Sequence, residues 1–173
     1  MGVRKTQPPD GSLLHSFTAL PGAHVDCYHA DVDRRLDLTA YITTFFDTSV
    51  FRLERRILAL AGQQYATTED VNMLANDQCE HFATWQVEQR TDDELLMGVR
   101  GQPIKTWLFT RENETGGAAL YFGSAVIPED TGTGGTPRIS AIIRALTPLH
   151  KLYSRILLML AARALRRPER SVG

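Results

Sequence analysis

Two side chains on one predicted helix carry groups that could perform acid–base chemistry. His150 and Tyr153 are three residues apart in an apolar helical pattern near the end of the sequence, and this spacing places both on one helix face. The imidazole could act as a general acid or base, and the phenol could orient a substrate as a hydrogen-bond donor. The pair could equally be rim or core residues, because buried Tyr and His usually find structural hydrogen bonds.

Aromatic and small side chains in the predicted strands form a second group of candidates. Trp85 and Trp107 fall in neighbouring strand patterns, and Tyr121 and Ser124 fall in a third. These residues could wall a ligand cavity, because binding pockets are mainly apolar with a few placed polar groups. Ordinary packing against helices is the alternative for both tryptophans. The candidate ligand-binding residues are therefore Trp85, Trp107, Tyr121, Ser124, His150 and Tyr153.

Possible metal ligands near the N-terminus lack a suitable arrangement. On a strand, His24 and Asp26 point to one side while Cys27 and His29 point to the other, so no face holds three ligands. A metal site completed by His81 or Cys79 is the alternative, but the spacing of these residues is not that of ligands on one helix or in a zinc knuckle. We therefore expect neither a metal ion nor a cofactor.

The first half of the sequence combines one strand with several helices. A period of two over 24–30 predicts a strand, and Asp37 then begins a helical pattern over 38–46. A second helical pattern covers 50–60. Residues 67–70 form a capping box that predicts a further short helix.

The second half combines an antiparallel meander with one long helix. Four strands rich in aromatic and β-branched residues are predicted at 82–89, 94–99, 104–111 and 119–127. A flexible connection at 128–137 leads to an amphipathic helix over 138–167, which Pro148 could kink or divide. A sheet with one apolar face needs a covering layer, so we expect an α+β fold in which this helix packs across the sheet.

Basic residues are concentrated in the last part of the sequence. Residues 138–173 carry eight Arg or Lys against one acid, whereas residues 1–137 carry eleven against nineteen. The formal net charge of −1 argues against nucleic acid as a partner of the whole protein, because phosphate binding needs a net basic face. The basic helix could contact an anionic surface or an acidic protein, or it could be an ordinary solvated face.

The composition predicts a cytoplasmic protein without a secretory leader or a transmembrane segment. The apolar run at 156–162 is far shorter than the about 20 residues that a membrane-spanning helix needs. Cys27 and Cys79 lack the spacing of a disulfide framework or a zinc module, which indicates reduced thiols. We expect three parts: a flexible leader over 1–22, a single domain over 23–167 and a frayed tail over 168–173.

Five segments are similar to those of uncharacterised bacterial proteins of unknown function: FRLERRILAL (51–60), FATWQVEQR (82–90), DELLM (93–97), LYFGSAVIP (120–128) and HKLYSRILLMLAARAL (150–165). The order of elements also resembles the helix-grip fold of the START-like (SRPBCC) superfamily, which contains polyketide cyclases and lipid-transfer domains. In that architecture, a curved sheet and the C-terminal helix enclose a ligand cavity. The resemblance therefore implies a hydrophobic small-molecule pocket.

Three functional hypotheses follow from the sequence. The leading one is binding of a hydrophobic or amphipathic small molecule between the sheet and the C-terminal helix. The first alternative is a cyclase- or dehydratase-like enzyme that uses His150 as the acid–base group and Tyr153 as the orienting donor in the same pocket. The second alternative is weak association of the basic helix with an anionic membrane surface or an acidic protein.

Overall fold

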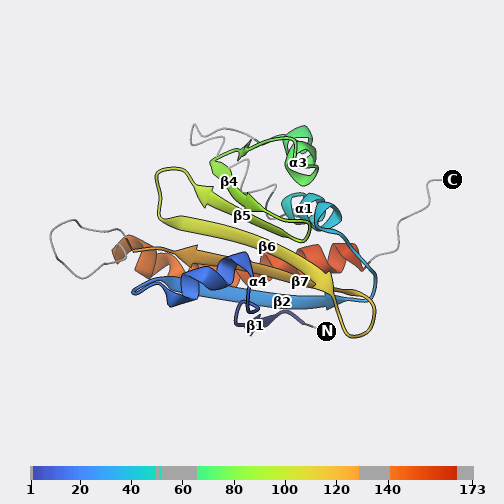
Figure 1. Cartoon of the computed structure of the whole chain (residues 1–173), viewed down its shortest axis with the longest axis horizontal. Coiled ribbons are helices and arrows are strands. Elements are labelled where there is room, and N and C mark those ends of the chain that lie inside the picture. Colours follow the sequence, from blue (N-terminus) through green and yellow to red (C-terminus); the bar gives the residue numbers. More distant parts are fainter. Residues whose placement is uncertain (1, 50, 52–65, 129–140, 167–173) are drawn as a thin grey trace.

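A computed structural model describes residues 2–49, 51, 66–128 and 141–166, with the side chains of the last stretch described from Lys151 onward. At its centre is a seven-stranded antiparallel sheet with the strand order β1-β2-β7-β6-β5-β4-β3 (Figure 1). The strands are β1 (Arg4–Thr6), β2 (His24–Val32), β3 (His81–Phe82), β4 (Trp85–Arg90), β5 (Glu94–Val99), β6 (Ile104–Glu112) and β7 (Ala118–Val126). Sheet and helices together make the α+β fold that the order of elements predicts.

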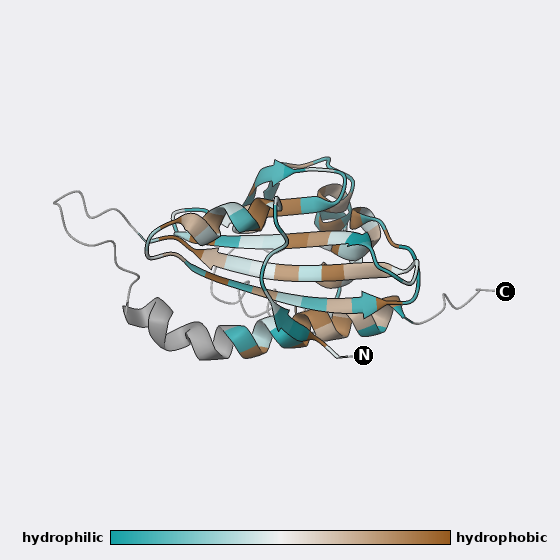
Figure 2. Ribbon diagram, turned by 60° about the horizontal axis from the view of Figure 1, so that its bottom comes forward, coloured by the Kyte–Doolittle hydropathy of each residue, from teal (hydrophilic) through white to brown (hydrophobic). Residues whose placement is uncertain are grey.

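The two faces of the sheet carry different helices. The α-helices of the described residues, α1 (Leu38–Phe46), α3 (Thr68–Ala75) and α4 (Ala141–Leu165), cover one face, and α4 packs along β2 and β7 beside α1. The other face is covered by the 3-10 helix η1 (Leu13–Ala19), which contacts β2, β5 and β7. Figure 2 shows η1 in front of the sheet, with α4 running below it. The C-terminal helix therefore packs against the sheet as predicted.

Local sequence signals account for where the short helices begin. The carboxylate of Asp37 accepts a hydrogen bond from the main-chain N–H of Ala40 at 2.7 Å, and Thr67 and Asp70 form the predicted reciprocal capping box. Both predictions are thus confirmed. The long helix α4 continues through Pro148 as one element, so the predicted division into two pieces is not present.

Strand β7 is buried on both faces because two separate cores meet it. Leu120 and Phe122 join the main core beneath the helices, whereas Ala119 and Tyr121 join a smaller core around Leu14 of η1. A strand between two apolar layers shows a nearly continuous apolar sequence rather than a clean alternation. Hydropathy alone therefore does not indicate which β7 side chains face α4.

The prediction that residues 1–22 form a flexible leader is wrong. Strand β1 pairs with β2, with Arg4 opposite His29, and the side chain of Leu14 is 0% exposed. The main-chain N–H of Leu13 donates to the buried carboxylate of Glu94 at 2.8 Å, which ties η1 to the sheet. The Pro- and Gly-rich composition that suggested disorder forms turns on either side of this packed segment.

The strands of the meander lie close to where the alternation predicts them. The four predicted strands correspond to β4, β5, β6 and β7, and the strand at 24–30 corresponds to β2. Two short strands, β1 and β3, were not predicted. The predicted helix at 50–60, the connection at 128–137 and the tail at 168–173 fall almost wholly outside the described residues. In the part of the chain that the structure describes, no helix has the length and apolar character to cross a membrane.

Candidate functional site

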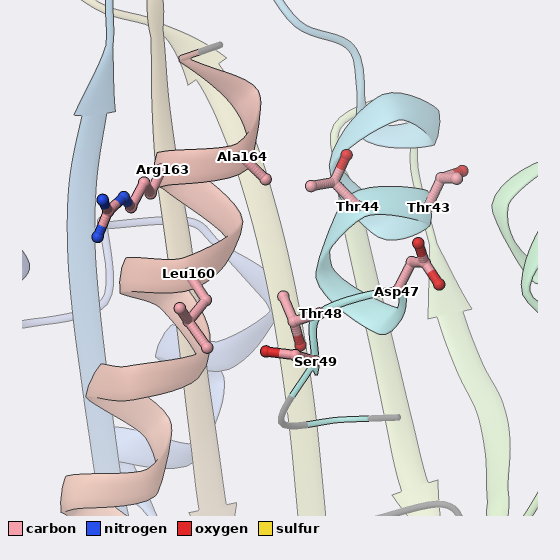
Figure 3. Close-up of a pocket in the computed structure, with 8 residues that line it drawn as sticks. All are labelled: Thr43, Thr44, Asp47, Thr48, Ser49, Leu160, Arg163 and Ala164. Carbon is pink, nitrogen blue, oxygen red and sulfur yellow. The ribbon is translucent and has the colours of Figure 1, made fainter. Parts of the chain in front are cut away.

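A cleft between the end of α1 and the last turns of α4 is the candidate site (Figure 3). Its volume is about 660 Å³, within the range of about 300–1,000 Å³ that is usual for small-molecule sites. Two segments supply its described lining residues: Thr43, Thr44, Asp47, Thr48 and Ser49 around the end of α1, and Leu160, Arg163 and Ala164 on α4.

Hydroxyl side chains are concentrated where α1 ends. The hydroxyl of Thr48 donates to the carbonyl of Phe45 at 3.0 Å, which fixes this buried side chain against the last helical turn. Thr44 and Ser49, by contrast, make no hydrogen bond to another described residue. Their hydroxyl groups are therefore available to a ligand.

The α4 side chains that face α1 across the cleft are apolar. Figure 3 shows Leu160 and Ala164 on the side of α4 that faces α1, whereas Arg163 extends over the other side of α4. Thr44 points from α1 toward α4, and Asp47 points away from it. An apolar wall thus faces a hydroxyl-bearing wall. This arrangement suits a ligand that has an apolar part and a hydrogen-bonding part.

The six residues predicted to line one cavity lie on both faces of the sheet. Trp85 and Tyr153 pack against the main core on the helix side, and Ser124 pairs with Asp26 on the same side. Trp107 and Tyr121 belong to the second core beneath η1. The prediction that all of these residues share one cavity is therefore corrected for Trp107 and Tyr121.

Ser124 lies in a buried polar contact rather than in the cleft. Its hydroxyl donates to Oδ1 of Asp26 at 2.5 Å, and both side chains are at least 95% buried. The second oxygen of Asp26, Oδ2, has no hydrogen-bond partner among the described residues. Burial and the nearby Asp26 raise the pKa of Cys27 to about 12, so this thiol stays protonated and is a poor nucleophile.

Both tryptophans have structural roles. The side chain of Trp107 is 0% exposed, and its Nε1–H donates to the carboxylate of Glu94 at 2.7 Å. The half-buried ring of Trp85 packs beside Phe51 and Phe82, with ring-centre distances of 5.9 and 6.2 Å. Packing within a core, the alternative weighed for these residues, is what the structure shows.

The described residues do not test the predicted acid–base pair. Tyr153 is half-buried against the main core, and the side chain of His150 lies outside the part of the chain whose side chains are described. No group of three or more His, Cys, Asp or Glu among the described residues could hold a metal ion. The enzyme hypothesis that uses His150 and Tyr153 therefore stays a prediction.

The hydroxyl-bearing wall was not identified from the sequence. Residues 47–49 lie between the two predicted helices at 38–46 and 50–60, and Thr43 and Thr44 lie within the first of them. The signal was the density of hydroxyl groups in TTFFDTS (43–49) at the end of an amphipathic helix. The position of α4 beside this segment could not be deduced from the segment itself.

No family model matches the sequence, and no curated protein matches it.

Proposed function

We propose that the protein binds an amphipathic small molecule in the cleft between α1 and α4. The observation that carries this proposal is the pairing of two unengaged hydroxyl groups, on Thr44 and Ser49, with the apolar side chains of Leu160 and Ala164 across a cleft of about 660 Å³. A ligand with a hydroxylated head and a short apolar tail would satisfy both walls. The resemblance to helix-grip proteins, in which the sheet and the C-terminal helix enclose a ligand cavity, supports ligand binding next to this helix but implies a site between helix and sheet.

The proposed ligand lies beside α4 rather than beneath its described part. Under that part of the helix, Leu157, Leu158 and Ala161 pack onto Tyr28 and Phe122, and all five side chains are at most 4% exposed. Close packing of this kind holds no void of ligand size. The site expected between sheet and helix is therefore proposed at the open junction of α4 with α1.

Octyl glucoside, an uncharged molecule with a hydroxylated head and an apolar tail, is a suitable probe. Below its micelle concentration, we expect saturable one-to-one binding in native mass spectrometry and isothermal titration. Ala164→Trp fills the cleft from the α4 side and should weaken binding about tenfold, or by about 1.4 kcal/mol. Thr44→Val replaces the hydroxyl group with a methyl group and keeps the shape of the side chain. It should weaken binding about fivefold, the usual effect of one lost hydrogen bond.

Met159→Trp is the matched control, because it places the same large side chain on the exposed side of the same helix, where Met159 is 49% exposed. Its affinity should stay close to that of the unmodified protein. Unchanged binding by Ala164→Trp, or equal losses in Ala164→Trp and Met159→Trp, would place the ligand elsewhere and contradict the proposal.

The exposed side of α4 favours a second candidate function, association with an anionic membrane surface. Leu152 is 54% exposed and Met159 is 49% exposed, and the exposed Arg155 and Arg163 alternate with them along the helix. A helix that presents both arginine and large apolar side chains to solvent is typical of peripheral membrane contact. This proposal extends the hypothesis based on the basic C-terminal end of the sequence.

Flotation with vesicles tests the second candidate. The protein should float with vesicles that contain phosphatidylserine, should not float with pure phosphatidylcholine, and should be released by salt, because each arginine near an anionic surface contributes only about 1 kcal/mol. Leu152→Glu combined with Met159→Glu should abolish flotation. Leu20→Glu, at an exposed apolar residue that follows η1, serves as the control. Equal flotation of both variants would eliminate this function.

A further inference from the structure

A second cavity lies on the η1 face of the sheet, away from the α1–α4 cleft. It has a volume of about 760 Å³ and is formed by β1, by the ends of β2 and β6, by β7 and by the β6–β7 turn. Its lining includes two arginines, a histidine, a tyrosine and several carboxylates. No other site described above uses these groups.

Strand register brings these side chains together in two adjacent rows. In the first row, Arg4 of β1 is opposite His29 of β2, which is opposite Tyr121 of β7. In the next row on the same face, Asp31 of β2 and Arg111 of β6 lie on either side of Ala119 of β7. A single methyl group thus separates a carboxylate from a guanidinium. The small side chain of Ala119 leaves a hollow above the sheet, which the neighbouring long side chains surround.

Several charges around the hollow are already paired. The carboxylate of Asp31 accepts hydrogen bonds from Arg4 at 3.2 Å and from His29 at 3.1 Å, and Glu112 at the rim pairs with Arg35 at 2.7 Å. Because a guanidinium can only donate, the contact of Arg4 with Nδ1 of His29 at 3.4 Å makes Nδ1 the acceptor. The proton of the neutral ring is therefore on Nε2, facing Asp31.

Arg111 is not part of these pairs. One of its N–H groups donates to the hydroxyl of Tyr121 at 2.9 Å, and its guanidinium carbon lies 5.3 Å from the centre of the Tyr121 ring. It forms no ion pair with any residue that the structure describes. The tyrosine fixes the guanidinium at the edge of the hollow while its remaining donors stay available. A planar fork of donors of this kind matches the two oxygens of a carboxylate.

We propose that this hollow binds the carboxylate of a small organic acid, with Arg111 and the hydroxyl of Tyr121 as the principal donors and Ala119 as the floor. The surrounding charge favours a carboxylate over a phosphate group. Asp33 and Glu114 are exposed and line the same cavity, so a phosphate dianion would meet stronger repulsion than a singly charged carboxylate.

Binding of the carboxylate is coupled to the protonation of His29. Burial is the largest cause of the lowered pKa of His29; Asp31 opposes the shift, and Arg4 and Arg111 add to it. A bound carboxylate adds a negative charge to the same cavity and therefore raises the pKa of His29. By linkage, affinity for the carboxylate increases as the pH falls through the pKa of His29 and this ring becomes charged.

Titration of the full chain by nuclear magnetic resonance tests the site, with benzoate, inorganic phosphate and uncharged benzyl alcohol as probes. Benzoate should shift the His29 ring and Arg111 Nε–H signals saturably and should raise the pKa of His29. Phosphate should bind about tenfold more weakly, because its second charge meets the rim carboxylates. Benzyl alcohol should cause no saturable shift of these signals.

Variants of two exposed arginines distinguish specific recognition of the carboxylate by Arg111 from a general effect of positive charge. Arg111→Gln should weaken benzoate binding about tenfold, and Arg111→Lys, which keeps the charge but loses the fork, about threefold. Arg100→Gln, in the turn after β5, removes an exposed arginine outside the cavity and should leave binding unchanged. The proposal is overturned if benzoate gives no saturable shift, if phosphate binds as tightly, or if Arg111→Gln binds benzoate like the unmodified protein.

Discussion

Replacing Trp107 with alanine is expected to lower the free energy of unfolding by about 4 kcal/mol, the usual cost of removing a fully buried aromatic side chain. The ring is 0% exposed and lies 5.4 Å from the ring of Phe109 and 6.3 Å from that of Tyr121, measured between ring centres. Its removal leaves a cavity beneath η1 and also removes the hydrogen bond to Glu94. Urea denaturation followed by circular dichroism measures the loss.

The conservative variant Trp107→Phe separates packing from hydrogen bonding. It keeps most of the apolar area and loses only the Nε1–H donor, so the expected cost is about 1–2 kcal/mol, characteristic of a buried carboxylate that loses one partner. Glu94 still accepts from the main-chain N–H of Leu13 in this variant. If Trp107→Ala and Trp107→Phe lost equal stability, packing beneath η1 would not be the main contribution of this residue.

The helix caps and the attachment of η1 show which parts of the fold are predictable from the sequence. The capping residues Asp37, Thr67 and Asp70 act within three residues of their partners, so their helices could be located from local patterns. The attachment of η1 depends on Glu94, which is 81 residues away from Leu13. No local pattern contains this contact, and the Pro- and Gly-rich composition around η1 indicated disorder instead.

The short strands β1 and β3 were not predicted, for a related reason. β1 and β3 are only three and two residues long and carry no measurable alternation. Their pairing partners define them as strands, because β1 adds to the edge of β2 and β3 adds to the edge of β4. Strand periodicity needs about four or more residues to be recognised. The edge strands β1 and β3 can therefore be identified only in the assembled sheet.

The candidate sites were less predictable than the fold. Alternation along β7 places Tyr121 and Ser124 on opposite faces, but both faces are apolar, so the sequence did not show which face α4 covers. The carboxylate site also depends on register. Asp31, Ala119 and Arg111 lie on three strands that are neighbours in the sheet, and only their pairing places the small residue between the two charged ones.

Gly123→Val is expected to destabilise the protein by about 3 kcal/mol or more, because it overfills a closely packed contact between η1 and the sheet. A Cβ atom at Gly123 would lie 2.3 Å from Cδ2 of Leu14 and 2.8 Å from the main-chain oxygen of Asp26. The leucine methyl can move, but the oxygen belongs to β2, which pairs with β7 along its whole length. Relief of the clash therefore requires η1 to lift or the central strand pair to separate.

Two further variants identify which of these contacts dominates. Gly101→Ala is a control, because its Cβ atom meets nothing within 4 Å and only its φ of +70° is unfavourable, at a cost of about 1 kcal/mol. The double variant Gly123→Val with Leu14→Ala frees space under η1 but leaves the contact with β2. If the double variant is more stable than Gly123→Val alone, the clash with η1 dominates, because a rigid clash with the main chain of β2 could not be relieved by shortening Leu14. A Gly123→Val protein as stable as Gly101→Ala in urea denaturation would contradict the close approach of η1 to the sheet, on which the buried position of Trp107 also depends.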